Sequence, residues 1–543
     1  MKKNILFLTL CALVLMSSCA KFDEMEPEGN GLTENQYKES IATVPARSNA
    51  TFNSLFTMMS EPCAVFPSSS RPDDFGYVMI AFSNDLEGPD CWMPNSGYNW
   101  FSVCGEYTSR NANYANPYIR YMTPYMQIRV ANEVIGMYDV ETASQEGIYQ
   151  LAQARACRAF AYEQLAPSFQ FLSNKDGLCV PLVLETTLDP ANNPRATVAE
   201  VYKQILEDLD FAVKYLEGFD RGSDKSRINQ QVAYGLRARA NLAMGNWSDA
   251  QADAEKAMAG YRAYTIDEVS TPAFCNIADA SWIWGADVTQ EQAAKMAYAT
   301  SSAWIGSFSS DSYSAACACY AGINNLLYNK IPDTDIRKQW WIHQENGSLY
   351  SSLLNGLTWG DAKGQEIVNL YIKDVKEPYT EFTNVKFGLI SGVASDKNDS
   401  DWPLMRYEEM KLIQLEAKAR QNQDVTSELQ SFIRQTRDPQ YIVSAKGLSI
   451  LDEIWFQRRV ELWGEGFSIY DANRLDKPIV RFHEGETTCY PDAFQINLGK
   501  DNGWRLMRFP QSELDTNFGI VDNKDGDQPV QGNEGSLKDC VTD

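Results

Sequence analysis

Apolar residues recur at intervals of three and four positions along much of this chain, which is the spacing of one face of an α-helix. The pattern fades in the middle of the chain and returns before the C-terminus. Two of the stretches with this helical spacing are residues 198–216 and 233–257. The other six are residues 35–59, 118–137, 145–171, 405–421, 425–437 and 449–463. The sequence therefore predicts a mainly α-helical protein.

The most regular helix is predicted over residues 198–216. One apolar stripe runs along it, made of Val198, Val201, Tyr202, Ile205, Leu209, Ala212, Val213 and Leu216. Thr197 and Glu200 flank its start with the spacing of a capping box, in which each side chain accepts a hydrogen bond from an otherwise unpaired backbone N–H.

A pair of helices that touch closely is predicted over residues 233–257. Small residues recur where the two helices would meet, namely Ala233, Ala240, Ala250, Ala254 and Ala257, and Gly245 supplies the turn. This unit resembles a tetratricopeptide helix-turn-helix, whose repeat is about 34 residues, although the chain holds one good copy and weaker echoes. Three or more such pairs would stack into a curved wall.

Residues 264–403 have a different character. Helical periodicity fades, Ser, Gly, Asn and aromatic residues rise, and short apolar alternations such as Trp282-Ile283-Trp284 appear. We interpret this stretch as an irregular, loop-rich lobe inserted between a helical region at 33–263 and C-terminal helices and loops at 404–543. Aromatic-bearing loops on a rigid scaffold are where binding sites tend to lie.

The N-terminus has the pattern of an export signal. Lys2 and Lys3 precede an apolar run that is too short for a membrane span, and two serines then lead to Cys19. This arrangement predicts a lipoprotein signal at residues 1–18, lipidation of Cys19 and a flexible tether at 19–32. An ordinary secretory signal with an incidental cysteine is the alternative.

The net charge of the chain limits which binding partners are expected. Lys and Arg number 48 against 72 Asp and Glu, a formal net charge of −24, which would repel nucleic acid. We expect no nucleic-acid partner, and contact with the membrane only through the N-terminal lipid.

No metal or cofactor site is predicted. Ten cysteines follow Cys19, either as buried thiols or with one or two disulfides among them. Cys317 and Cys319 have a single intervening residue, unlike zinc-binding pairs, and the two histidines lie far apart in sequence. Asp333 and Asp335 could contact calcium, but no further oxygen ligands follow at loop spacing.

No catalytic constellation is found either. Nucleophile elbows, phosphate-binding glycine loops and zinc-protease helices do not occur in the sequence. Acidic pairs do occur, and a glycosidase needs only two carboxylates, but pairs are expected by chance among so many acidic residues. These pairs are Asp73-Asp74, Asp333-x-Asp335 and Glu408-Glu409. We therefore predict a protein that is not an enzyme, with a surface glycoside hydrolase as an alternative.

Aromatic residues in polar loops are the more informative feature, because sugars stack their C–H faces on Trp and Tyr rings. Five rings are candidates for ligand contact: Trp92, Tyr98, Trp100, Trp304 and Tyr313. The alternative for each is a ring that fills the core beneath a loop.

Several motifs, taken in order, resemble those of the SusD/RagB family of outer-membrane lipoproteins. The helix at 152–162 is similar to that family's Ala/Arg-rich helix, and 229–257 resembles its principal tetratricopeptide unit. Arg406-Tyr407-x-Glu409 and Arg458-Arg459-x-Glu461-Leu462 match two later motifs, and 509–514 resembles a Pro-x-x-Glu turn near the C-terminus. The resemblance covers most of the chain.

The resemblance implies a SusD-like fold and a non-catalytic protein that captures glycan, or in some members oligopeptide, as a lid over a SusC-like TonB-dependent barrel. The acidic run after Cys19 resembles a surface-export tag, which implies an outer-membrane location facing the exterior. Arg458, Arg459 and Glu461 are expected to tie helices together by buried ion pairs. A helical-repeat assembly factor of the outer membrane is a further alternative.

Overall fold

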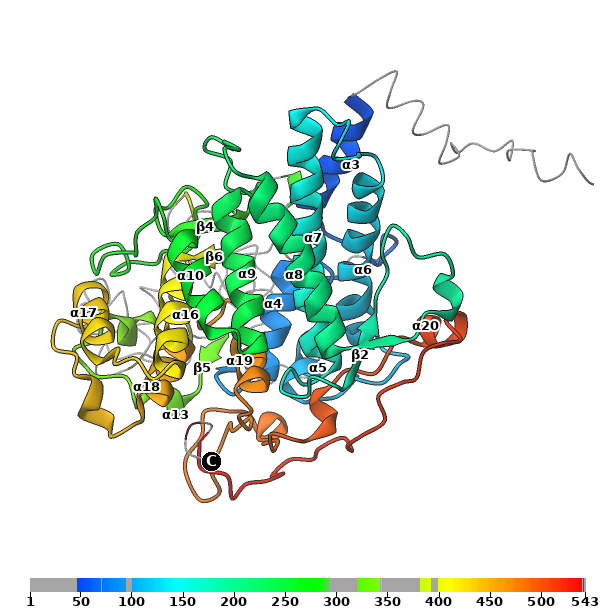
Figure 1. Ribbon diagram of the computed structural model, residues 1–543. Coiled ribbons are helices and arrows are strands. Elements are labelled where there is room, and N and C mark those ends of the chain that lie inside the picture. The colour runs from blue at the N-terminus through cyan, green and yellow to red at the C-terminus, as the bar shows by residue number, and fades with distance from the viewer. Residues whose placement is uncertain are drawn as a thin grey trace, which may run out of the picture. The chain divides into compact units, whose positions relative to one another are not determined.

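The computed structural model describes most of the chain after residue 45 (Figure 1). The described residues are 46–69, 71–93, 100–289, 291–292, 321–341, 343, 381–391, 399–539 and 541. The chain divides into two compact units, Met1–Asn53 and Ser54–Asp543. Within the first, the structure describes the beginning of α3 (Ala46–Thr57), and everything below concerns the second.

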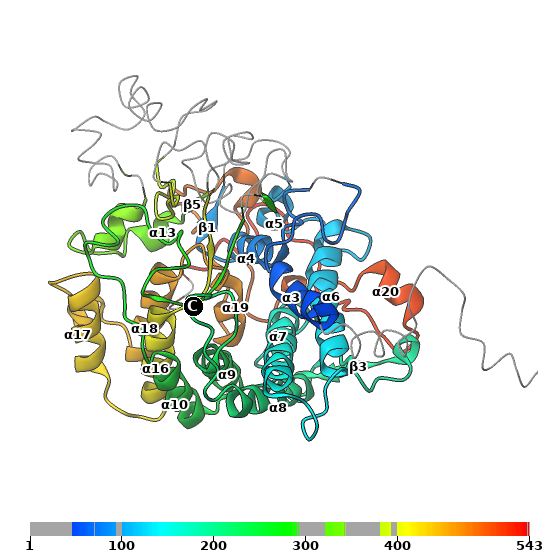
Figure 2. The same cartoon turned by 90° about the horizontal axis from the view of Figure 1, so that it is seen from above.

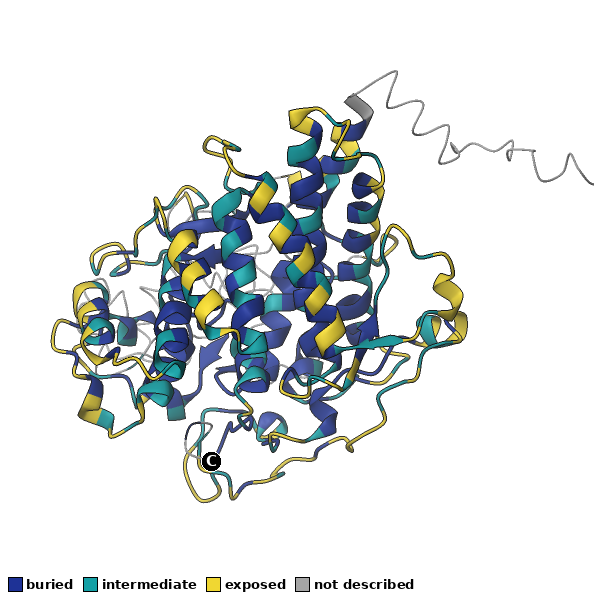
Figure 3. Ribbon diagram, in the orientation of Figure 1, coloured by how far each residue is buried: buried dark blue, intermediate teal, exposed yellow. Residues whose placement is uncertain are grey.

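The second unit is built on helices that pack one against the next along the chain (Figure 1). These are α6 (Ala115–Ile135), α7 (Gln145–Phe169), α8 (Val198–Tyr215), α9 (Gln230–Met244) and α10 (Trp247–Ala257). Helices α8, α9 and α10 turn exposed residues outward and buried residues toward the core (Figure 3). The predicted mainly helical fold is confirmed, and the ends of α6 to α10 lie within a few residues of those predicted.

The local signals in this region formed as predicted. At the start of α8, the Thr197 hydroxyl accepts a hydrogen bond from the backbone N–H of Glu200, and the Glu200 carboxylate accepts one from the backbone N–H of Thr197. Gly245 ends α9 at φ +83°, a left-handed conformation that glycine adopts without strain. Alanines that allow α9 and α10 to approach closely are fully buried: Ala233, Ala240, Ala250, Ala254 and Ala257.

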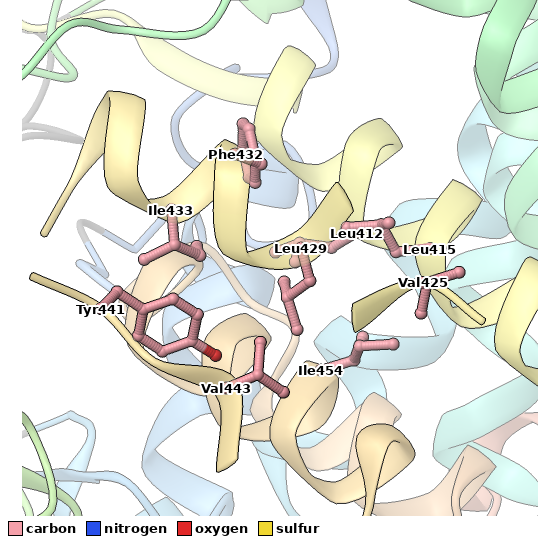
Figure 4. Close-up of a cluster of buried hydrophobic side chains, with 9 residues drawn as sticks. All are labelled: Leu412, Leu415, Val425, Leu429, Phe432, Ile433, Tyr441, Val443 and Ile454. Atoms are coloured by element: carbon pink, nitrogen blue, oxygen red, sulfur yellow. The ribbon is translucent and has the colours of Figure 1, made fainter. Parts of the chain in front are cut away.

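The C-terminal part adds a second group of helices. Helix α16 (Tyr407–Arg420) packs against α10 and against α18 (Ile450–Glu461), and α17 (Thr426–Thr436) lies beside them. Figure 4 shows the apolar cluster that joins these elements: Leu412, Leu415, Val425, Leu429, Phe432, Ile433, Tyr441, Val443 and Ile454. All three helices were predicted.

Three short antiparallel strand pairs connect distant parts of the chain. They are β1 (Cys91–Trp92) with β5 (Gly322–Ile323), β2 (Leu178–Pro181) with β3 (Arg195–Thr197), and β4 (Trp282–Ala286) with β6 (Trp402–Arg406). The Trp282-Ile283-Trp284 alternation is therefore a buried strand, which pairs with the segment just before α16. The proposed domain boundaries at 264 and 403 remain a prediction.

Several short elements carried no clear sequence signal. They are α5 (Ser102–Gly105), α13 (Asn325–Tyr328), α19 (Ser468–Arg474), α20 (Gln511–Thr516), η1 (Pro190–Asn192), η3 (Ile336–Trp340), η4 (Val443–Lys446), η5 (Asp492–Phe494) and η6 (Gly503–Arg505). The longer helix α4 (Gly76–Glu87) was also missed. Eleven of its residues, Asp85 and Glu87 among them, are buried, so no polar face alternates with an apolar one.

A network of buried ion pairs joins α16, α18 and the segments around them. We call it the ionic junction, and its members are Arg337, Lys386, Arg406, Arg437, Glu408, Glu461 and Glu465. Glu461 contacts Arg437 at 2.8 Å and Arg406 at 3.3 Å, and Glu465 contacts Lys386 at 2.7 Å. Burial raises the pKa of Glu461, but the surrounding arginines outweigh it and hold that pKa well below its usual value.

The neighbouring arginines of α18 confirm the predicted ion pairs. Arg458 contacts Asp471 on α19 at 2.9 Å, and Arg459 contacts Asp90 at 2.6 Å. The indole Nε1 of Trp463 donates to the backbone oxygen of Asp90 at 2.8 Å. Helix α18 therefore fixes the residue that directly precedes strand β1.

The cysteines in the described part of the chain are free thiols: Cys63, Cys91, Cys104, Cys157, Cys179, Cys275 and Cys489. Among the described residues, no three or more His, Cys, Asp or Glu side chains gather as a metal site would require. None of the helices in that part combines the length and apolarity that a bilayer span requires.

Candidate ligand-binding pocket

A pocket of about 740 Å³ opens where four segments of the chain meet. Strand β1, strand β5 and helix α13 lie near one another at this end of the unit (top of Figure 2). The lining residues are Trp92, Asn325, Leu326, Asn329, Glu381, Phe382, Glu486, Thr487, Thr488, Cys489, Tyr490 and Pro491. Its volume is within the range of small-ligand sites, about 300–1,000 Å³.

Backbone and side-chain hydrogen bonds hold the four segments together. The backbone N–H of Ile323 donates to the oxygen of Phe382 at 3.0 Å, next to the β1–β5 pair. The Asn325 amide donates to the oxygen of Thr487 at 3.0 Å and accepts from the N–H of Cys489 at 3.1 Å. The Tyr490 hydroxyl donates to the oxygen of Cys91 at 3.1 Å. The pocket floor is therefore a connected frame.

Phe382 stands out on the pocket wall. Its φ is +70°, a left-handed conformation that bulky side chains rarely adopt and that tends to persist where a site requires it. Its half-buried ring lies 5.1 Å from the ring of Tyr328 and 5.7 Å from that of His343. The ring therefore has a fixed position at the pocket edge.

The polar groups of the pocket suit a ligand rich in hydroxyls. Asn329 and Thr487 are exposed, and among the described residues their side chains have no hydrogen-bond partner within the protein. Glu381 is 40% exposed at the rim, and Glu486 is exposed. Amide, hydroxyl and carboxylate groups beside an aromatic ring can bind the hydroxyls and the C–H face of a sugar.

The structure describes two of the five predicted ligand-contacting rings and does not bring them together. Trp92 lines the pocket, but it is only 5% exposed and its indole Nε1 donates to the oxygen of Ile323 at 2.8 Å. Trp100 lines a different, small cavity, where the Arg71 guanidinium lies 4.6 Å from its ring centre. The predicted ligand residues Tyr98, Trp304 and Tyr313, and the lipidation site Cys19, lie outside the described residues.

Most pocket residues were not anticipated. Phe382, Asn329, Glu381 and the 486–491 segment carry no motif, and they come from parts of the chain far apart in sequence. The excess of aromatic and polar residues after position 264 pointed to the region, but no signal identified the individual residues.

The acidic pairs that could have suggested catalysis have other partners. Asp73 contacts Arg71 at 2.8 Å, and Asp335 contacts Arg337 at 2.6 Å. The carboxylate of Asp74 accepts from the backbone N–H of Phe66 at 2.7 Å. The remaining members pair likewise: Asp333 with Lys338, Glu408 with Arg406 and Arg437, and Glu409 with Arg239. Each carboxylate is engaged in holding the fold.

A second, smaller cavity of about 80 Å³ lies among α7, α9, α16 and α19. Glu163 of α7 borders it, and in the described structure neither of its buried carboxyl oxygens has a hydrogen-bond partner. Burial raises the pKa of Glu163 to about 8. This carboxyl therefore holds its proton at neutral pH, in contrast to Glu461.

Comparison with known proteins covers nearly the whole second unit. Residues 81–242 match a family model described as starch-binding and associating with the outer membrane, and residues 244–528 match the model of the SusD family. The second match alone spans more than half of the chain. Among curated proteins, none matched this sequence.

Solved structures show the same fold. A SusD-like carbohydrate-binding protein from Bacteroides vulgatus is 22% identical with a TM-score of 0.66, the match covering 88% of this chain and 97% of that one. A SusD superfamily protein from Bacteroides thetaiotaomicron is 18% identical with a TM-score of 0.64, over 88% and 99%. Surface glycan-binding protein A from the same organism, in complex with laminarihexaose, is 13% identical with a TM-score of 0.61, over 88% and 99%.

Proposed function

This chain belongs to the SusD family, and from that premise we propose that it binds glycan at the outer-membrane surface without cleaving it and passes it to a SusC-like TonB-dependent transporter. Lipidation of Cys19 would hold the chain at the membrane. The neighbour solved with laminarihexaose has the same fold, which supports glycan as the ligand class.

The observation that carries the proposal is the pocket beside α13. It combines a fixed aromatic ring, Phe382, with the exposed amide of Asn329 and the exposed hydroxyl of Thr487. A sugar needs both kinds of group, because its ring faces are apolar and its edges carry hydroxyls. The match to the SusD family favours binding over hydrolysis.

A binding screen of the soluble chain, starting at Lys21, tests the proposal. Retardation in gels containing polysaccharide, followed by calorimetry, should reveal at least one glycan that is bound and recovered intact. Binding of oligopeptides but of no glycan would replace the ligand class, and release of reducing ends would revive the hydrolase alternative.

Variants assign the binding to the pocket. Phe382→Ala removes the ring, and Asn329→Ala removes only an exposed amide, so at least the second should fold normally. Each should weaken glycan binding by about tenfold, on the order of 1.4 kcal/mol. The matched control is Tyr215→Ala, which removes a half-buried ring from α8, outside the pocket, and should leave affinity unchanged.

A further inference from the structure

We propose that the pocket selects its glycan by charge, admitting neutral or amino-bearing sugars and rejecting chains that carry carboxylate or sulfate groups. This inference rests on the proposed function and specifies its substrate class. It follows from the charged groups at the pocket and from what lies around them.

The pocket has acidic side chains and no basic ones among its described lining residues. Glu381 and Glu486 come from segments more than 100 positions apart in sequence, yet both face the same pocket. Solvent-exposed carboxylates are negatively charged at neutral pH. A ligand that enters therefore meets two negatively charged side chains.

Three described cations that adjoin this wall in sequence or by ring contact are already engaged. Lys330 contacts Asp539 at 2.8 Å, and Lys338 contacts Asp333 at 2.5 Å. Arg481 lies behind Tyr490, is fully buried, and donates to the backbone oxygens of Leu86 and Gly88. None of these cations is placed to neutralise an anionic ligand.

A histidine lies beside one of the two carboxylates. The Nε2 atom of His343 lies 3.3 Å from an oxygen of Glu381, and its ring stacks on Tyr328. When protonated, this imidazole would offset part of the Glu381 charge. Charge selection should therefore be tested at pH 8, because raising the pH favours the neutral form of any histidine.

The stretches that adjoin the pocket residues in sequence add no positive surplus. Residues 94–99 carry no charged side chain, and residues 293–320 carry Lys295 and Asp311. Residues 344–380 carry five acidic and three basic side chains. The whole chain is acidic as well, so the long-range field has the same sign as the pocket.

Two physical effects then favour neutral and amino sugars. An anionic group brought into the pocket loses hydration and gains no cation in return, which is unfavourable. An ammonium group gains an ion pair with either glutamate and can also face the Phe382 ring. Uncharged hydroxyls accept or donate hydrogen bonds with Asn329, Thr487 and the carboxylates at no such cost.

The experiment compares polysaccharides that differ mainly in charge. The pairs are laminarin with laminarin sulfate, dextran with dextran sulfate, and fully methyl-esterified with de-esterified homogalacturonan. Affinity gels and calorimetry at pH 8 and low salt should show the neutral member of a bound pair binding at least about tenfold more tightly. We call the ratio of the affinities for the neutral and the anionic member the affinity gap. Raising the salt should narrow this gap, because ions screen charges beyond about 10 Å at 0.1 M.

A double variant assigns the discrimination to the pocket. Glu381→Gln with Glu486→Gln should narrow the gap by about fivefold while retaining the neutral glycan. The matched control is Glu141→Gln with Glu217→Gln, which changes the net charge equally at exposed positions outside the pocket and should leave the gap intact.

The outcomes separate the two proposals. If an anionic member binds as tightly as its neutral counterpart, the charge inference is overturned while glycan capture stands. An unchanged gap in the double variant, or an equal change in the control, also overturns it. If no glycan of either charge is retained, the proposed function fails and the charge inference fails with it.

Discussion

The helical row from α7 to α10 and the ionic junction around α18 are both well packed, but they differ in what dominates their contacts. In the row, alanines and an apolar stripe let helices approach closely. In the junction, four cations and three carboxylates form a network of buried ion pairs, and Asp335 adds a fourth carboxylate through Arg337. The row forms a regular wall, whereas the junction collects irregular segments. Beside the junction, Arg459 of α18 pairs with Asp90 and fixes the start of the strand that leads to the pocket.

Two glutamates make the contrast sharp. Glu461 is ion-paired with arginines that hold its pKa low. Among the described residues, Glu163 on α7 of the row feels Arg239 but forms no hydrogen bond with it, and burial raises its pKa to about 8. Burial opposes ionisation of both, so the partners decide the outcome. Both regions contain buried charge pairs, since Arg158 pairs with Asp208 and Arg237 with Asp253 in the row, but in the junction several cations and carboxylates share one larger network.

The largest expected effect comes from breaking the junction at Glu461. Glu461→Ala leaves Arg337, Arg406 and Arg437 with fewer partners in a buried site, so unfolding in urea should need about 3–5 kcal/mol less free energy. The control is Glu133→Ala, which breaks an exposed pair with Arg129 and should change stability by less than about 1 kcal/mol. Equal effects of the two variants would show that the junction is not a stabilising centre.

Glu163→Gln should raise the free energy of unfolding at neutral pH, whereas Glu461→Ala lowers it. The substitution removes a buried carboxyl whose ionisation is unfavourable. Below pH 4.5 the carboxyl is protonated in both folded and unfolded states, and the variant should match the parent. Between pH 4.5 and 8 only the unfolded state ionises, so the parent loses stability with rising pH and the variant does not.

Above pH 8 the difference in free energy of unfolding between Glu163→Gln and the parent protein should level off at a few kcal/mol, since each unit of pKa shift corresponds to about 1.4 kcal/mol. Urea unfolding at pH 4, 6 and 8.5 measures it. The exposed Glu207→Gln on α8 serves as the control and should show no such trend. A parent whose stability advantage over Glu163→Gln grows with pH would reverse the assignment.

Overpacking tests the close approach of α9 and α10. Ala254→Leu inserts a large side chain at a fully buried position and should destabilise the protein by about 1–3 kcal/mol. The same substitution at exposed Ala259, just after α10, should be nearly neutral. Thermal unfolding of both variants distinguishes a tight helix pair from a tolerant one.

The smallest effect is expected at the start of α8. Thr197→Ala removes one half of the capping box and should cost about 1 kcal/mol. Thr142→Ala, at an exposed position between α6 and α7, is the control and should change little. If the two variants are equally stable, the capping box contributes nothing measurable.

The same contrast explains what the sequence could predict. Helix α8 and the α9–α10 pair follow from local periodicity, a capping box and one glycine, all of which act within a few residues. Helix α4 was not predicted, because it is buried on all sides and shows no alternation of polar and apolar faces. The pairing of Arg459 and Glu461 in buried bonds was foreseen, but Asp90 as the partner of Arg459 was not, because 369 positions separate the two residues.

The candidate site was the part predicted least well, again because the residues that form it are far apart in sequence. Its frame consists of backbone hydrogen bonds among segments near 91, 323, 382 and 489, and such bonds leave no trace in side-chain pattern. Aromatic content drew attention to Trp92, whose ring is mostly buried and bonded to the frame. The left-handed conformation of Phe382 has no sequence signature.

Hydrogen–deuterium exchange of the soluble chain with and without a bound glycan tests most directly whether ligand is held at this irregular end. Ligand should slow exchange in peptides that contain Phe382 and residues 486–491, and leave peptides from α8, α9 and α10 unchanged. Protection confined to those helices, with none around Phe382, would contradict the account and move the binding face to the helical row.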